Sequence, residues 1–272
     1  MSESFEFRPE IRLEKVSFYY PETEQLVFND LSIELPKGVT TLVGQNGTGK
    51  STLLLLAAGV LLPVEGTVYL QEIDTRNLLE EQERQLYVSF VYQNMEFETE
   101  ETIGDLLEYV HENGFHEAKD PGLVSNLVDV CELNKVLGKK TQEVSKGELQ
   151  RIIVAFSMLY GSRIIMMDEP IFALEEYQKH RIMDFLVDYS RTQDISLYYS
   201  VHELDISEKY SDYLLMFHKN GRLELGQTKQ IFTKENIAEA YEVPYIMLKR
   251  KEVIYRETLQ DLSSKGSTDQ SK

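Results

Sequence analysis

The sequence is short of cysteine and of long hydrophobic runs. Cys131 is the only cysteine in 272 residues, which excludes an intrachain disulfide and a thiolate metal cluster and fits a reducing cytosolic compartment. The longest apolar stretch, residues 53–64, contains Gly59 and Pro63 and falls well short of the roughly 18 to 20 residues that span a bilayer. The acidic N-terminus lacks the positive and apolar regions of a secretory signal. We therefore expect a cytoplasmic protein that meets a membrane only through a partner.

Basic residues are also scarce. Lys and Arg total 28 against 46 Asp and Glu, which gives a formal net charge of −18. A nucleic-acid-binding surface needs concentrated positive charge, so this balance argues against a general nucleic-acid binder and requires any phosphate site to be local. The basic triplet at 249–251 is better explained as a solvated face of a helix or strand. The remaining composition is that of an ordinary soluble globular protein.

Hydrophobic patterning predicts an α/β fold with a mixed sheet. Turn residues such as Pro21, Asn29-Asp30 and the segment 36–38 favour antiparallel pairing of the early strands. The later strands alternate with helical segments, as parallel α/β units do. The expected strands are residues 11–20, 31–35, 40–43, 67–70, 87–92, 164–167, 197–201 and 214–217.

Two helical regions interrupt or follow these strands. Between about 94 and 161 the strand signal disappears and apolar residues such as Ile103, Leu107 and Leu127 recur at helical spacing, which predicts an inserted helical subdomain. A helical extension is expected at 227–262, and residues 263–272, which include no apolar side chain, are expected to be disordered. We expect one domain over residues 1–262.

Residues 44–52, GQNGTGKST, match the phosphate-loop pattern G-x-x-x-x-G-K-[ST]. The motif follows a short apolar strand and precedes a helical run, which is the context that it requires. Its glycines let backbone N–H groups curl around phosphates, Lys50 reaches the β and γ oxygens, and the Ser51 hydroxyl is a ligand for Mg²⁺. The sequence therefore predicts nucleotide binding at this loop.

A second chemical motif is IIMMDEP, residues 164–170, in which a hydrophobic strand ends in two adjacent carboxylates. A strand of this kind is buried, so the two carboxylates at its end are expected to have a functional role. In a phosphate-loop enzyme Asp168 would hold Mg²⁺ through water and Glu169 would polarise the attacking water. The alternative, in which Asp-Glu-Pro only caps a strand, is weak beside the phosphate loop.

The order of these motifs resembles the ATP-binding cassette (ABC) family, the ATPase subunits of membrane transporters. The resemblance covers about residues 11–230 and implies a P-loop NTPase core with an N-terminal antiparallel β-subdomain. The family signature LSGGQ corresponds here to VSKGE, residues 144–148. Ser145 and Glu148 also form an S-x-x-E capping box, which opens a helix whose N-terminus favours an anion.

The resemblance implies a head-to-tail dimer in which Ser145 and Gly147 contact the γ-phosphate held by the other subunit. Lys146 stands where glycine is usual and Glu148 where glutamine is usual, so their effect on dimer closure stays open. Glu175 likewise replaces the aspartate of the family's Ser-Ala-Leu-Asp turn, so its role in communication across the dimer also stays open.

Three single residues complete the resemblance. Tyr20 resembles the aromatic residue that stacks on adenine, with Tyr19 as the competing choice. Gln93 resembles the glutamine that senses Mg²⁺ and the attacking water. His202 corresponds to the switch histidine that contacts the γ-phosphate, and a neutral imidazole can supply the required donor.

These observations predict an ATPase subunit that binds ATP and Mg²⁺, forms a homodimer or pairs with another ATPase subunit, and drives a separate integral membrane permease from the inner face of the cell membrane. The acidic segment 94–101 is expected to receive a basic permease helix, and residues 231–246 are similar to those of metal-chelate, siderophore and cobalamin importers. The alternatives are a soluble ABC-type ATPase without transport and a weakly catalytic nucleotide-binding regulator.

The resemblance also implies which residues form the site. The expected ATP contacts are Tyr20, Gly44, Gln45, Asn46, Gly47, Thr48, Gly49, Lys50, Ser51, Thr52, Ser145 and Gly147. The expected Mg²⁺ ligands are Ser51, Gln93 and Asp168, and the expected catalytic residues are Glu169, His202 and Gln93.

Overall fold

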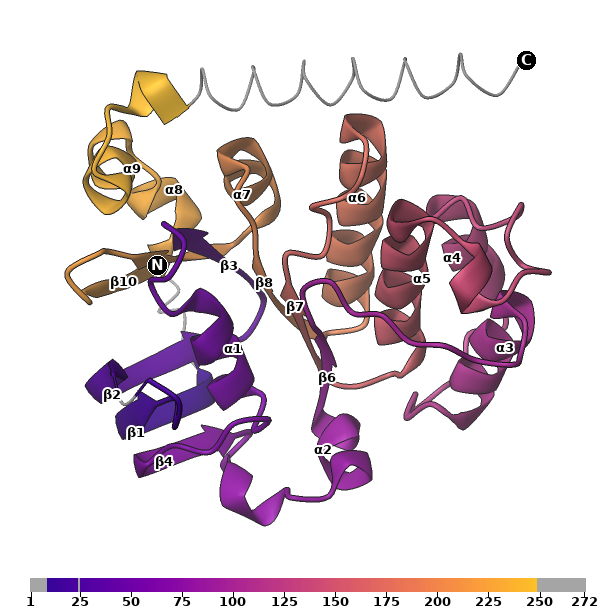
Figure 1. Ribbon diagram of the computed structural model, residues 1–272, viewed down its shortest axis with the longest axis horizontal. Coiled ribbons are helices and arrows are strands. Elements are labelled where there is room, and N and C mark those ends of the chain that lie inside the picture. Colours follow the sequence, from indigo (N-terminus) through magenta and orange to yellow (C-terminus); the bar gives the residue numbers. More distant parts are fainter. Residues whose placement is uncertain (1–8, 24, 249–272) are drawn as a thin grey trace, which may run out of the picture.

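The computed structural model describes residues 9–23 and 25–248, and it contains two sheets and a group of helices (Figure 1). The expected tail at 263–272 and the basic triplet at 249–251 lie outside these residues. The smaller sheet is antiparallel, with the strand order β2-β1-β4-β5. Its strands are β1 (Pro9–Tyr19), β2 (Leu26–Pro36), β4 (Glu65–Leu70) and β5 (Ile73–Asp74).

The larger sheet has six strands in the order β10-β9-β3-β8-β7-β6. All neighbours from β9 to β6 are parallel, and β10 pairs antiparallel with β9. The strands are β3 (Val39–Gly44), β6 (Val88–Val91), β7 (Ile164–Asp168), β8 (Ser196–Ser200), β9 (Tyr213–Phe217) and β10 (Leu223–Gln227). β3, β7 and β8 are buried along their whole length, as strands covered on both faces are.

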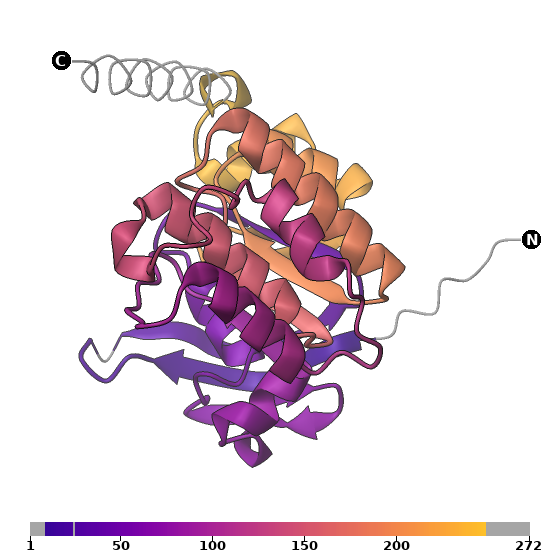
Figure 2. The same cartoon turned by 90° about the vertical axis from the view of Figure 1, so that its right-hand side faces the viewer.

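Helix α1 (Lys50–Ala57) lies between the two sheets, where Leu53, Leu54 and Leu56 pack into the apolar core that the sheets share. The opposite face of the six-stranded sheet is covered by α5 (Lys146–Leu159) and α6 (Glu176–Thr192), which belong to a second core. Figure 2 shows these helices above the antiparallel sheet, which lies at the bottom in indigo and purple.

The predicted helical insertion is present, because no strand occurs in the described chain between β6 and β7. It contains α3 (Ile103–Asn113), α4 (Leu123–Val130) and α5, whose apolar faces pack together. The C-terminal extension contains α8 (Thr228–Ile231) and α9 (Lys234–Tyr241). The other helices are α2 (Glu81–Tyr87), α7 (Leu204–Tyr210) and the 3-10 turns Thr75–Asn77 and Thr141–Glu143. Among the described residues, no helix has the length and apolarity needed to cross a membrane.

The structure corrects the expected turn at Asn29-Asp30. β2 runs through this position, and a β-bulge forms there, because Val16 pairs with Leu31 whereas Phe18 pairs with Phe28. Asp30 takes a left-handed φ of 52° and its N–H donates to the Ser17 hydroxyl. Asn and Asp tolerate this backbone region in turns and bulges alike, so the sequence signal did not separate the two.

Candidate active site

The phosphate loop joins the buried end of β3 to the start of α1. Gly44 has a φ of 144°, and a Cβ placed there would lie 2.5 Å from the carbonyl oxygen of Phe217, so the position needs glycine. Gly49 precedes the helix with a φ of 100°. The first N–H groups of α1 have no intrahelical partner and give this end of the helix a positive dipole. The loop can therefore surround an anion with backbone donors.

Lys50 points back into the loop. Its ammonium donates to the carbonyl oxygens of Gly44 (2.8 Å) and Gln45 (2.9 Å), and the residue is only 7% exposed. Burial lowers the pKa of Lys50 below its ordinary value, although the negative charges of Glu169 and Asp168 oppose part of this shift. The cation thus lies where the phosphate loop and the carboxylate strand meet.

The end of β7 presents Asp168 and Glu169 beside β8. Asp168 is opposite Ser200 in the parallel register, and the Ser200 hydroxyl donates to Asp168 Oδ1 (2.6 Å). The same hydroxyl accepts the N–H of Glu169 (3.0 Å), which has a positive φ of 52° before Pro170. Such backbone strain is common where a side chain must point in one direction for function. Ser200 therefore fixes both carboxylate residues.

Three polar side chains converge at the ends of three neighbouring parallel strands. His202 Nε2 lies 2.7 Å from Glu169 Oε1, and Gln93 Nε2 donates to Glu169 Oε2 at 2.9 Å. Gln93 follows β6, Glu169 follows β7 and His202 follows β8, so the sheet itself brings them together. The three residues selected from sequence as catalytic candidates thus form one hydrogen-bonded group.

The protonation of Glu169 follows from this arrangement. Burial alone would raise its pKa, but the hydrogen bond from His202, the interactions with His202 and Lys50 and the hydrogen bond from Gln93 outweigh burial and lower the pKa of Glu169 below its ordinary value. The side chain is therefore a carboxylate at neutral pH. A carboxylate beside a phosphate-binding loop is able to orient and polarise a water molecule.

The predicted aromatic residue also lies at the loop. The Tyr20 hydroxyl is 3.1 Å from the Thr52 hydroxyl in the first turn of α1, whereas Tyr19 belongs to β1 and pairs with Leu26. Phe28 from β2 comes so close to Gly49 that a Cβ there would lie 2.9 Å from the Phe28 ring. Within the loop, the Thr48 hydroxyl donates to the carbonyl oxygen of Gln45. Residues of the antiparallel sheet and of the segment after β1 therefore contact the N-terminal end of α1.

The predicted capping box at the start of α5 is present. Glu148 accepts hydrogen bonds from both the N–H (2.7 Å) and the hydroxyl (2.8 Å) of Ser145, and the Glu148 N–H donates to the Ser145 hydroxyl (3.3 Å). The backbone hydrogen bond from Ser145 is the main reason that the pKa of Glu148 is lowered. Ser145, the N-cap of α5, and Gly147, in its first turn, lie at the start of α5 rather than on the phosphate loop, with Gly147 next to the Ala173 carbonyl.

Two residues at the site were not found from the sequence. Ser200 ends the apolar strand LYYS, and its position level with Asp168 follows only once β7 and β8 are paired. Tyr241, at the end of α9, contacts the phosphate loop through its hydroxyl and its carbonyl oxygen. Nothing in the local sequence around Tyr241 indicates this contact.

Comparison with known proteins identifies the family of the chain. The family model described as ABC transporter matches residues 28–172, which is more than half of the chain. The chain belongs to the ABC transporter family. An ABC transporter ATP-binding protein of Archaeoglobus fulgidus is 31% identical to this ABC ATPase over 84% of the chain and 95% of the relative. A molybdate import ATP-binding protein of Haemophilus influenzae is 25% identical over 86% of the chain and 88% of the relative.

Solved structures agree on the fold of this ABC ATPase. A structure of an inward-facing metal-chelate type ABC transporter aligns with a TM-score of 0.68 at 22% identity and covers 87% of the chain and 90% of the matched chain. A dimeric ATP-binding cassette in a post-hydrolysis state with ADP and Pi aligns with a TM-score of 0.68 at 21% identity and covers 80% and 98%. The expected P-loop core with its antiparallel and helical parts is confirmed.

Proposed function

We propose that this ABC ATPase binds ATP at residues 44–52, hydrolyses it with Glu169 as the residue that orients water, and drives a separate membrane permease. The observation that carries the proposal is the convergence of Gln93, Glu169 and His202 beside Lys50. ATP phosphates would accept hydrogen bonds from the backbone of the loop and from Lys50. Tyr20 would lie against the adenine, since its hydroxyl already contacts Thr52 at the same helix end.

The side chains near the loop fit Mg²⁺. They offer a serine hydroxyl (Ser51), an amide (Gln93) and a buried carboxylate (Asp168), and oxygen is the ligand that Mg²⁺ prefers. In the described part of the chain no group of three His, Cys, Asp or Glu side chains could hold a metal ion, so the remaining ligands would be phosphate oxygens and water. Mg²⁺ would supply positive charge to the transferred phosphate.

The roles of the catalytic group follow from its contacts. Glu169 would accept a hydrogen bond from the attacking water, and Gln93 and His202 keep the carboxylate in place until the phosphate arrives. His202 would then donate to the γ-phosphate. Ser200 has the supporting role, because it holds Asp168 and the backbone of Glu169 together.

The start of α5 supports a dimer. Ser145 and Gly147 form an anion-favouring helix end that does not belong to the chain's own phosphate loop, so we propose that it completes the ATP site of a second subunit. Before ATP arrives, however, the Ser145 hydroxyl donates to the ionised Glu148 carboxylate. A γ-phosphate would have to displace that carboxylate or approach against its charge.

We therefore predict that Glu148→Gln strengthens ATP-dependent dimerisation. Glutamine keeps the capping box but removes one negative charge from each of the two ATP sites of the dimer. At about 1 kcal/mol for each charge contact, the two sites together should lower the dimer dissociation constant about 30-fold. The measurement is the dimer fraction against protein concentration by sedimentation velocity with ATP, in a Glu169→Gln background that prevents turnover. Unchanged or weaker dimerisation would exclude charge repulsion by Glu148.

Ser145→Ala provides the opposite control for this site. It removes the donor to the phosphate, so ATP should still bind to the monomer while the dimer is lost. Loss of the helix cap should lower the free energy of unfolding by about 1 kcal/mol. The midpoint of thermal unfolding without nucleotide measures this effect separately. If only that midpoint changes, the capping role accounts for Ser145 completely.

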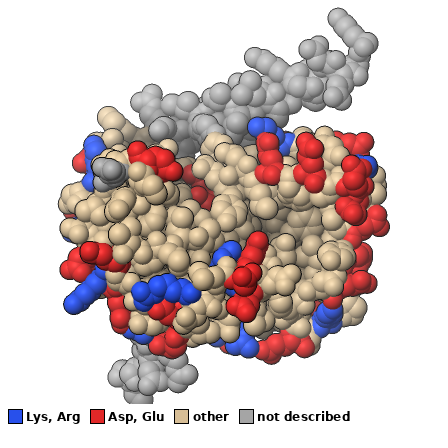
Figure 3. All heavy atoms as spheres, turned by 60° about the horizontal axis from the view of Figure 1, so that its bottom comes forward, with Lys and Arg blue, Asp and Glu red and all other residues tan. Residues whose placement is uncertain are grey.

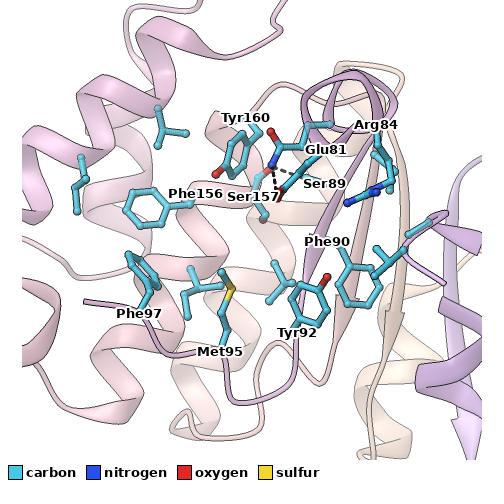
Figure 4. Close-up of a pocket in the computed structure, with 18 of the residues that line it drawn as sticks. Glu81, Arg84, Ser89, Phe90, Tyr92, Met95, Phe97, Phe156, Ser157 and Tyr160 are labelled. Carbon is cyan, nitrogen blue, oxygen red and sulfur yellow. Dashed lines mark hydrogen bonds between the residues drawn. The ribbon is translucent and has the colours of Figure 1, made fainter. Parts of the chain in front are cut away.

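A groove between the sheet and the helical insertion is the proposed docking site for the permease. It contains a cavity of about 330 Å³ between α2, β6, the following segment, α3 and α5. Figure 4 shows Phe97, Phe156, Met95 and Tyr92 around this cavity. Tyr92 (41% exposed), Met95 (37%) and Tyr109 (65%) leave apolar surface open to solvent. Exposed apolar surface around a cavity is typical of a protein contact site.

The segment that contributes Met95 and Phe97 to this groove is acidic, which favours a basic partner helix. Glu96, Glu98, Glu100 and Glu101 are all exposed in the segment that follows Gln93. Figure 3 shows acidic side chains along the right-hand edge, the side on which α3 and α4 lie in Figure 1. Two ion pairs connect this segment to residues on either side of Ser145: Lys140 pairs with Glu100, and Lys146 pairs with Glu96.

Purification from the native host tests the transporter proposal. Tagged Glu169→Gln protein, with ATP and Mg²⁺, should co-purify an integral membrane protein from detergent-solubilised membranes. Met95→Glu in this background should reduce its recovery about tenfold or more, because a charge enters an apolar contact. Leu79→Glu is the matched control, since Leu79 is 66% exposed and does not line the cavity. A soluble partner in place of the membrane protein would favour the cytosolic ATPase alternative.

Import of a small solute such as a metal chelate is the transport reaction that we favour. The similarity to a molybdate import protein and to a metal-chelate type transporter supports this choice. A co-purified solute-binding protein would support import and provide the means to identify the solute. Recovery of a permease with no such protein would favour export.

A further inference from the structure

The end of helix α9 docks directly on the phosphate loop, although about two hundred residues of sequence separate them. The Gly44 N–H donates to the Tyr241 hydroxyl (3.2 Å), and Gln45 Nε2 donates to the Tyr241 carbonyl oxygen (2.7 Å). The carbonyl belongs to the last residue of α9, so the hydrogen bond from Gln45 caps the helix end. One residue thus holds the first two residues of the loop.

Apolar packing and an ion pair keep α9 in this position. Ile237 and Ala240 are fully buried against Val43, Leu214 and Met216, so the helix lies on the ends of β3 and β9. Val43 immediately precedes Gly44. The following residue, Glu242, pairs with Lys219 from the turn between β9 and β10 (2.9 Å). Movement of α9 would therefore act on the strand end that carries the loop.

The held residues are the ones that orient Lys50. The Lys50 ammonium donates to the carbonyl oxygens of Gly44 and Gln45, the same two residues whose N–H and side chain bind Tyr241. A shift of the Gly44 and Gln45 peptides would move the cation that faces the phosphates. The contacts of Tyr241 with the loop go to Gly44 and Gln45, so it would act on Lys50 through these two residues.

We propose that Tyr241 is a positioning residue for ATP binding and that it couples ATP affinity to the docking of α9. The proposal rests on the assignment of residues 44–52 as the phosphate loop. Coupling of this kind is reciprocal, so ATP should also stabilise α9 in its docked position. A ligand or protein that displaces α9 would accordingly weaken ATP binding.

Tyr241→Phe tests the proposal, because it removes the hydroxyl and keeps the ring. Loss of one neutral hydrogen bond should raise the KM for ATP about three- to tenfold. The change in kcat should stay within about twofold, since the bonds between Tyr241 and the loop would be the same in the ground and transition states. Tyr189→Phe on α6 is the matched control and should leave KM unchanged. An unchanged KM in Tyr241→Phe would overturn the role of Tyr241. A three- to tenfold fall in kcat with no change in KM would overturn it as well.

Hydrogen exchange separates coupling from a purely structural effect. In the wild type, ADP should slow amide exchange in residues 233–248, and in Tyr241→Phe this response should be clearly smaller at saturating ADP. Equal protection in both proteins, or none in the wild type, would contradict the coupling. Lys50→Ala tests the assignment of the phosphate loop on which the proposal rests. If Lys50→Ala binds ATP normally, that assignment is wrong. If Lys50→Ala binds ATP poorly while Tyr241→Phe binds it normally, the phosphate loop is correct and only the role of Tyr241 is wrong.

Discussion

Glu169→Gln should keep ATP binding and lose ATP hydrolysis by about 10² to 10⁴-fold in kcat, the contribution of a positioned base or water-orienting group. Glutamine has nearly the same shape, and it can still accept a hydrogen bond from one neighbour. It lacks the full negative charge that polarises water. Single-turnover hydrolysis and equilibrium ATP binding by the same purified protein measure the two effects separately.

The structure explains why the charge rather than the contact matters. Gln93 and His202 both point hydrogen-bond donors at the carboxylate, and with Lys50 they keep the pKa of Glu169 below its ordinary value. The carboxylate is thus ionised above that lowered pKa, and its contribution to hydrolysis would be lost only as pH falls through it. Activity near neutral pH should not depend on the protonation of Glu169.

Glu169→Asp is the informative companion variant. It keeps the charge but withdraws it by one methylene from the position that Gln93 and His202 define, so kcat should fall while the pH dependence stays unchanged. An unchanged rate in Glu169→Gln would remove the catalytic role. A wild-type protein that binds ATP but never hydrolyses it would instead support the nucleotide-binding regulator considered from the sequence.

The fold and the core of the site could be predicted because their signals are local. The phosphate loop is one continuous motif, and Asp168 and Glu169 end a single buried strand. Parallel strands bring their carboxyl ends to one edge of the sheet, so Gln93, Glu169 and His202 meet once their strands are neighbours. The strand order that makes them neighbours is not contained in any of the three segments, and it was available only through the resemblance to the ABC family.

The parts that the sequence did not indicate depend on distant pairing. β10 was missed because its five residues, LELGQ, are only partly buried and contain glycine, so their strand pattern is weak. Ser200 and Tyr241 carry no motif, and their roles arise from the register of β8 beside β7 and from the packing of α9 on β3 and β9. Lys146 and Glu148 were recognised as departures from the family signature, but the direction of the Glu148 effect needed the observed bonds to Ser145.

Lys50→Ala should weaken ATP binding about 100-fold or more and lower turnover with it. Charge-assisted hydrogen bonds contribute about 1.5 to 3 kcal/mol each, and Lys50 would supply more than one to the β and γ phosphates. Removing the cation also leaves Asp168 and Glu169 without the positive charge that faces them, so the phosphates would enter a site of the same sign. Isothermal titration with ATP and with ADP measures the loss.

Lys50→Met separates charge from packing in this prediction. Lys50 is buried, and alanine would leave space in the loop as well as removing the ammonium, whereas methionine fills most of that space. Both variants should bind ATP equally poorly if the cation is responsible, and near-normal binding by Lys50→Met would contradict that explanation. The loss should also greatly exceed that of Tyr241→Phe, because Tyr241 bonds only to the N–H of Gly44 and the side chain of Gln45, whereas Lys50 itself would meet the phosphates.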